Sequence, residues 1–114
     1  MPYMKLETNV DISEAKAETL LKELSAAMAE ATGKPESVVQ VGLAGGVSMI
    51  MAGTTEPAVH IEAKGIGFPE EHARAMSEKA CAIVGRELGV PGRRIYLAFT
   101  AFKGAMWGVD GRTY

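Results

Sequence analysis

The chain has 114 residues, a net charge of −2 and a hydrophobic fraction of 47%, values that predict one soluble domain of common size. Its acidic balance and low aromatic content (6%) argue against a nucleic-acid-binding protein, which needs a basic face. The single cysteine, Cys81, excludes a disulfide framework and a Cys-x-x-Cys site. His60 and His72 are well separated in sequence and have no cysteine nearby, so we expect neither a metal nor a cofactor.

The sequence contains no apolar run of about 18 residues that would span a membrane. Its start lacks the basic segment and the apolar segment of a secretory signal. We therefore expect a cytoplasmic protein that contacts no membrane, with secretion by an unconventional route left open.

The first half of the chain predicts a strand, a helix and a second strand. Residues 3–8 form a short, partly alternating run that favours a strand. Apolar residues then recur at three- and four-residue steps, which indicates an amphipathic helix capped by Asp11 or Ser13. Gly33 ends this helix, and residues 38–43 form the second strand.

The same order of elements returns 56 residues later. Residues 58–64 predict a strand, a helix follows from Pro69, and residues 95–102 predict another strand. At this offset Gly33-Lys34-Pro35 falls on Gly89-Val90-Pro91, so both helices end in the same way. We interpret residues 1–114 as one domain with two pseudo-repeats, at about 2–56 and 57–114.

Two tandem βαβ units predict an α+β fold. A right-handed crossover makes the two strands of each unit parallel, and one four-stranded mixed sheet with both helices on one face follows. Alternate residues of the strand at 97–102 are apolar on both sides, so we expect the uncovered face of the sheet to be largely apolar. Such a face is unstable in water, and this favours a homo-oligomer.

Six motifs, spread over nearly the whole chain, carry a family resemblance: Met1-Pro2, Thr8-Asn9-Val10, Ala31-Thr32-Gly33-Lys34-Pro35, Glu56-Pro57, Gly65-Ile66-Gly67 and Arg94-Ile95-Tyr96. In this register the chain resembles the macrophage migration inhibitory factor (MIF) family of the tautomerase superfamily. The resemblance implies a homotrimer whose three sheets form a barrel with the helices outside. It also implies a keto–enol tautomerase that acts on aryl 2-oxo acids such as phenylpyruvate, or on dopachrome-type compounds.

By this resemblance Pro2 is the catalytic base. Removal of Met1 would leave a free prolyl amine, and an α-amino group has a solution pKa of roughly 8. An apolar pocket and a nearby lysine both disfavour the cation and so lower that pKa towards neutrality, where a base for proton abstraction works. The alternative for Pro2 is a residue merely tolerated at the start of a strand.

Three further residues are assigned to substrate binding by the resemblance. Lys34 would hold a substrate carboxylate, although a lysine after a helix also suits the negative end of the helix dipole. The backbone of Ile66 would contact substrate because the flanking Gly65 and Gly67 let the chain approach closely; an ordinary turn is the alternative. The family commonly has serine at the position of Gly65, so only main-chain contacts carry over there.

The aromatic residues Tyr96, Trp107 and Tyr114 fall where the family has pocket-lining residues, Tyr96 reaching into the neighbouring subunit. Packing in the core or between subunits is the alternative for each of them. Ala98 stands where well-known members have an asparagine that donates to substrate, so this contact is absent.

Two other function classes remain open from the sequence. One is a cytokine or host-interaction protein with a vestigial pocket, for which an extracellular receptor would be the partner. The family's Cys-x-x-Cys, which corresponds to Ala58-Val59-His60-Ile61, is missing, and this weakens that class. The other is a decarboxylase or dehalogenase, for which Arg93, Arg94 and Arg112 are the candidate residues by charge.

Overall fold

The structure is a computed structural model that describes residues 2–114. Two helices and four long strands make up its body: β1 (Tyr3–Thr8), α1 (Glu14–Thr32), β2 (Gln40–Ala44), β3 (Val59–Ile66), α2 (Glu70–Leu88) and β4 (Ile95–Phe102). The strands form one sheet in the order β2-β1-β3-β4. The pairs β1–β2 and β3–β4 are parallel, whereas β1 and β3 are antiparallel. The predicted α+β fold of two βαβ units is confirmed.

Both helices have 19 residues, and α2 begins 56 residues after α1. The Ser13 side chain caps α1 by accepting a hydrogen bond of 3.2 Å from the backbone N–H of Lys16. Gly33 and Gly89 end the two helices with φ angles of 69° and 67°, a left-handed conformation that glycine adopts without a steric cost.

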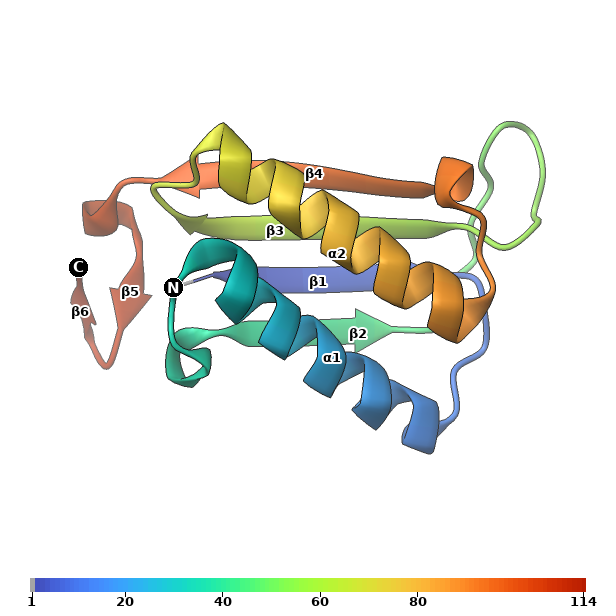
Figure 1. Cartoon of the computed structure of the whole chain (residues 1–114), viewed down its shortest axis with the longest axis horizontal. Coiled ribbons are helices and arrows are strands. Elements are labelled where there is room, and N and C mark those ends of the chain that lie inside the picture. Colours follow the sequence, from blue (N-terminus) through green and yellow to red (C-terminus); the bar gives the residue numbers. More distant parts are fainter. Residues whose placement is uncertain (1) are drawn as a thin grey trace.

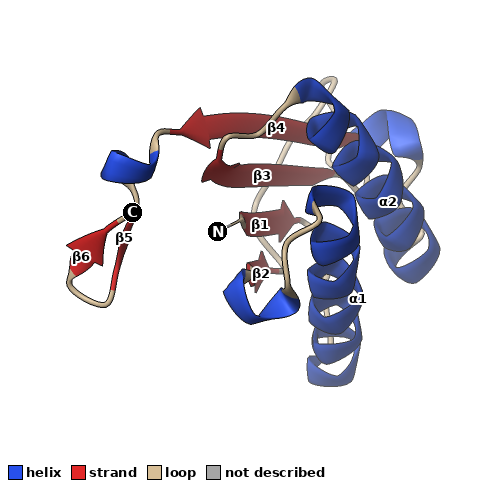
Figure 2. Cartoon of the chain, turned by 60° about the vertical axis from the view of Figure 1, so that its left-hand side comes forward, coloured by secondary structure: helices blue, strands red, loops and turns tan. Residues whose placement is uncertain are grey.

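Both helices cover the same face of the sheet, as Figure 1 and Figure 2 show, and the core lies between them and that face. Alternate residues of β1 and β3 are fully buried because successive side chains of a strand point to opposite faces. Burial of a large aliphatic side chain contributes roughly 1.5–3 kcal/mol. The buried cluster joins both helices to three of the four strands: Met4, Leu6, Leu24, Met28, Val59, Ile61, Met76, Ala80, Val84, Val90 and Ile95.

The opposite face of the sheet carries no helix and is more polar than the sequence of its last strand indicated. Lys5 lies opposite Glu62, and Glu7 lies opposite His60, on the two central strands. Lys5 also pairs with Glu7 along its own strand at 3.9 Å. The expectation of a largely apolar open face is therefore wrong, because it was drawn from β4, which is an edge strand.

The C-terminal residues form a small hairpin, β5 (Gly108–Val109) and β6 (Arg112–Thr113), that projects beyond the main sheet in Figure 2. The ring of Trp107 meets the ring of Phe102 edge to face, with centroids 5.8 Å apart, and so joins the hairpin to the end of β4.

Within residues 2–114, neither helix combines the length and the apolar character that crossing a bilayer requires.

At the far end of the sheet, three side chains from two of the motifs hold the loop at 51–57. Arg94 is 6% exposed, and its guanidinium donates to four backbone carbonyls, those of Met51, Thr54, Glu56 and Pro57, at 2.8–3.4 Å. Asn9 donates to the carbonyls of Thr55 and Glu56, and Thr8 donates to that of Ala58. These residues therefore have a structural role, and Arg94 is occupied by the loop.

We expect Arg94→Lys to lower the free energy of unfolding by about 1.5–3 kcal/mol, because a lysine ammonium cannot reach four diverging carbonyls as the planar guanidinium does. Urea unfolding at a fixed protein concentration measures this change. Arg93→Lys, at the exposed neighbouring position, is the matched control and should leave the midpoint unchanged. Equal midpoints for the two variants would contradict a structural role for Arg94.

Candidate active site

Pro2 lies at the start of a central strand, where backbone pairing fixes its position. Its carbonyl accepts a hydrogen bond of 3.0 Å from the N–H of Gln40 at the start of β2. On the other side, the pairing of β1 with β3 begins at Tyr3 and Lys64, so Gly65 and Ile66 extend beyond it. Pro2 is buried there, and it lines two separate hollows.

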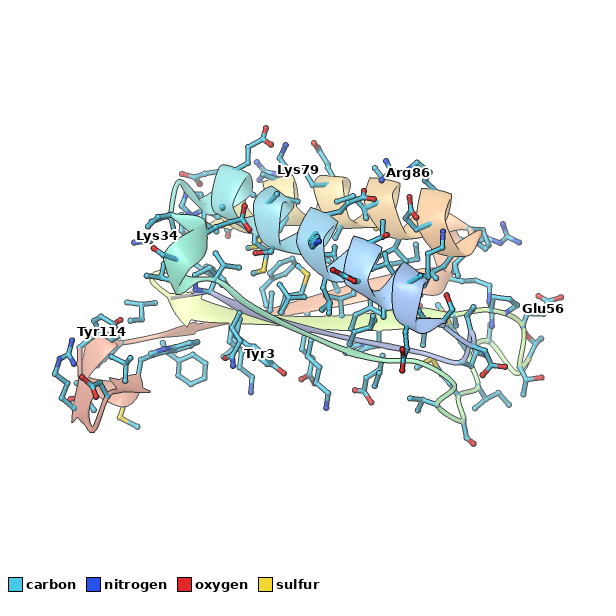
Figure 3. The ribbon with its side chains drawn as sticks, turned by 90° about the horizontal axis from the view of Figure 1, so that it is seen from below. Tyr3, Lys34, Glu56, Lys79, Arg86 and Tyr114 are labelled. Atoms are coloured by element: carbon cyan, nitrogen blue, oxygen red, sulfur yellow. The ribbon has the colours of Figure 1, made fainter. Side chains whose placement is uncertain are left out.

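The smaller hollow, of about 120 Å³, brings Pro2 together with Lys34 and Ile66. Lys34 follows α1, and Figure 3 places it at the end of the molecule opposite to Glu56. The hydroxyl of Thr32 fixes the turn before it: it donates to the Met28 carbonyl at 2.7 Å and accepts from the Lys34 backbone N–H at 3.3 Å. The structure thus brings a lysine and Ile66 to the same hollow as Pro2, and their roles in substrate binding stay predictions.

Gly65, which the resemblance assigns to substrate binding, is not among the residues that line this hollow. A Cβ atom at Gly65 would lie 2.5 Å from the Phe68 ring, so any larger residue here requires that ring to move from its present position. Phe68 itself lines the hollow and meets the Phe99 ring edge to face, with centroids 6.5 Å apart. The absence of a side chain at Gly65 is therefore linked to an aromatic wall at Phe68.

The larger hollow, of about 430 Å³, has Pro2 on one side and the C-terminal hairpin on the other. Trp107 and Tyr114 both line it, together with Val38 and Val39, which precede β2. The backbone N–H of Tyr114 donates to the Trp107 carbonyl at 3.1 Å, and this bond closes the hairpin. Two of the three predicted aromatic residues therefore lie beside Pro2.

Tyr96 does not lie beside Pro2 of its own chain. It pairs with His60, which precedes Gly65 by five residues along β3, a separation of about 16 Å at the usual rise of a strand. Its side chain is 61% exposed and lines another hollow, of about 210 Å³, with Met49, Ile50 and Met51. Only a second copy of the chain could bring a tyrosine at this position to Pro2.

The sequence reasoning missed Thr32, Phe68 and His72 as neighbours of Pro2. The sequence did offer a signal for His72, because it lies just after Gly65-Ile66-Gly67, in the first turn of the second helix, and so at this end of the sheet.

Within residues 2–114 no cluster of three metal-binding side chains is present. Burial raises the pKa of the Cys81 thiol, which makes it a poor nucleophile at neutral pH. The predicted removal of Met1 falls outside the described residues.

The chain is similar to known proteins in both sequence and structure. The family model described as macrophage migration inhibitory factor (MIF) matches residues 1–114. A MIF homologue of Trichuris trichiura is 35% identical over 115 residues and is covered in full, as is this chain. The D-dopachrome decarboxylase of Mus musculus is 34% identical over 101 residues, which cover 87% of this chain and 85% of that protein.

Among solved structures, the MIF homologue of Prochlorococcus marinus has the same fold, with a TM-score of 0.92 and 36% identity over 97% of both chains. Members of this family typically form trimers. This chain matches the family model and its relatives in sequence and in fold, and it does so over its full length. The chain therefore belongs to the macrophage migration inhibitory factor family.

Proposed function

We propose that this protein is a keto–enol tautomerase that acts on aryl 2-oxo acids of the phenylpyruvate type, with the amine of Pro2 as its base. The observation that carries this proposal is the place of Pro2 between two hollows of different chemistry. One is small and contains a lysine, and the other is larger and is bordered by two aromatic side chains.

The physical environment favours an unprotonated amine at Pro2 once Met1 has been removed. Pro2 is buried, and burial disfavours a charged group. The ammonium of Lys34 borders the same hollow and repels a second positive charge. An amine kept neutral near neutral pH can accept a proton from carbon, which is the role of a general base.

The two hollows suit the two ends of an aryl 2-oxo acid. The carboxylate would pair with Lys34 in the smaller hollow, while the ring would lie against Trp107 and Tyr114 in the larger one. This orientation directs C3 of the substrate towards Pro2 between them. The Pro2 nitrogen takes a proton from C3, the electrons of that C–H bond form the C2–C3 double bond, and the carbonyl oxygen gains a proton.

A homotrimer would complete this site. The uncovered sheet face, with its charged residues on β1 and β3, suits the water-filled interior of a barrel that three sheets would form. In such a barrel, Tyr96 of one chain would reach the hollow at Pro2 of its neighbour, because it lies too far from Pro2 of its own chain.

The related D-dopachrome decarboxylase raises decarboxylation as a second reaction. Within residues 2–114, however, the lining of both hollows at Pro2 contains no arginine. Arg94 is occupied by the loop at 51–57, and Arg112 lies on the exposed hairpin, where it pairs with Asp110 at 3.6 Å. This arrangement supports proton transfer without loss of the carboxylate.

We expect Pro2→Gly to lower kcat for phenylpyruvate tautomerisation by about 10²–10⁴-fold, since the positioned ring nitrogen is replaced by a mobile primary amine. Mass spectrometry of active wild-type protein should show the loss of one methionine, because Pro2 is an amide nitrogen while Met1 is attached. Circular dichroism of the variant provides the control for its fold. Equal rates for both proteins, or full turnover by protein that retains Met1, would exclude Pro2 as the base.

A mixing experiment tests whether Tyr96 acts across subunits. Pro2→Gly and Tyr96→Ala chains should each be weakly active alone, whereas co-refolding equal amounts should restore activity to about a quarter of the wild-type sites if three chains associate at random. The recovery is expected because some sites combine an intact Pro2 with a neighbour's intact Tyr96. Absence of recovery at substrate concentrations below the KM of the tyrosine variant would contradict a shared site.

A further inference from the structure

The smaller hollow holds one titratable side chain that the proposed mechanism has not yet used. His72 is the third residue of α2, and it lines the hollow together with Pro2, Lys34 and Ile66. Its side chain is half-buried. An imidazole can both give and take a proton, which is why histidine is the commonest general acid or base in enzymes.

The helix gives His72 a fixed place in the lining that it shares with Lys34. The backbone N–H of His72 donates to the Pro69 carbonyl at 3.0 Å in the first turn of α2, whose buried face packs against the sheet. Figure 1 shows the start of α2 and the end of α1 at the same end of the sheet as the N-terminus. His72 therefore enters the hollow from one helix, whereas Lys34 enters it from the turn after the other.

Among the other side chains that line this hollow, none is available to donate a proton to the 2-oxo oxygen of the substrate. The hydroxyl of Thr32 already donates to the Met28 carbonyl, so its proton is engaged. Lys34 is assigned to the substrate carboxylate, and Phe68 has no donor. Abstraction of the C3 proton places negative charge on the 2-oxo oxygen, and a donor at that oxygen lowers the barrier.

On the basis of the proposed function, we propose that His72 is the proton donor at the 2-oxo oxygen of the substrate. Pro2 takes the C3 proton, the C2–C3 double bond forms, and the carbonyl π electrons move to oxygen. The substrate carboxylate pairs with Lys34 and offsets its charge, so a protonated His72 is tolerated in the same hollow. The imidazolium of His72 then gives its proton to that oxygen, which yields the enol and a neutral imidazole. Pro2 releases its proton to water and His72 regains one from water, so the enzyme returns to its first state without any other reactant.

Two substitutions separate this role from simple packing in the first turn of α2. We expect His72→Ala and His72→Gln each to lower kcat for phenylpyruvate by about 10²-fold or more, with KM nearly unchanged. Glutamine can donate a hydrogen bond but cannot transfer a proton, so it should not restore kcat. Added free imidazole should raise the kcat of His72→Ala, an effect that a packing defect does not show. Glu71→Ala, at the exposed neighbouring position of the same helix turn, is the matched control and should keep wild-type kinetics.

The outcomes for His72 and for the proposed function are distinct when Pro2→Gly is measured beside these variants. A kcat of His72→Gln within about threefold of wild type, or a loss confined to KM, would overturn the role of His72 while Pro2→Gly still shows the loss of the base. A wild-type protein without tautomerase activity would overturn the proposed function, and the role of His72 with it.

Discussion

The backbone pairing of β1 on both of its edges determines what can happen at the start of this chain. β1 lies between β2 and β3, so the residue before it is held by the sheet even though it is close to a terminus. Terminal residues are usually poorly ordered unless an element of structure ties them down. A free amine at Pro2 would therefore be a positioned group, and the fold meets the main requirement for using it as a base.

The two βαβ units have similar backbones but different side chains at equivalent positions near the ends of the sheet. The turn after α1 presents Lys34, which is exposed beside Pro2, whereas the equivalent turn after α2 presents Val90, which is 2% exposed and part of the core. Likewise, Ala58, the counterpart of Pro2, is buried where Asn9 and Thr8 hold the chain. One end of the pseudo-symmetric sheet is thus closed by packing, while the other is left open for chemistry.

The fold could be predicted from the sequence because both halves have the same hydrophobic periodicity and the same helix-ending glycine, Gly33 or Gly89. The preference for right-handed crossovers then determined the strand directions. The hollow was predicted only in part, since Lys34 and Ile66 carried motif signals and His72 did not. The character of the open sheet face could not be inferred from β4 alone. It depends on the antiparallel register of β1 and β3, which places Lys5 opposite Glu62, and this register is set by tertiary pairing.

In the proposed trimer, the separation of Pro2 from Tyr96 within one chain would make association matter for activity as well as for stability. Within residues 2–114, β2 and β4 each have one neighbour in the sheet, so each offers an unpaired edge to another chain. Pro2 lies one strand in from the β2 edge, and Tyr96 lies on the β4 edge. In a ring that joins the β2 edge of one chain to the β4 edge of the next, a register that sets Tyr96 beside the start of β2 would also bring it towards the neighbour's Pro2. A single contact between chains would then both cover the unpaired edges of β2 and β4 and complete the site at Pro2.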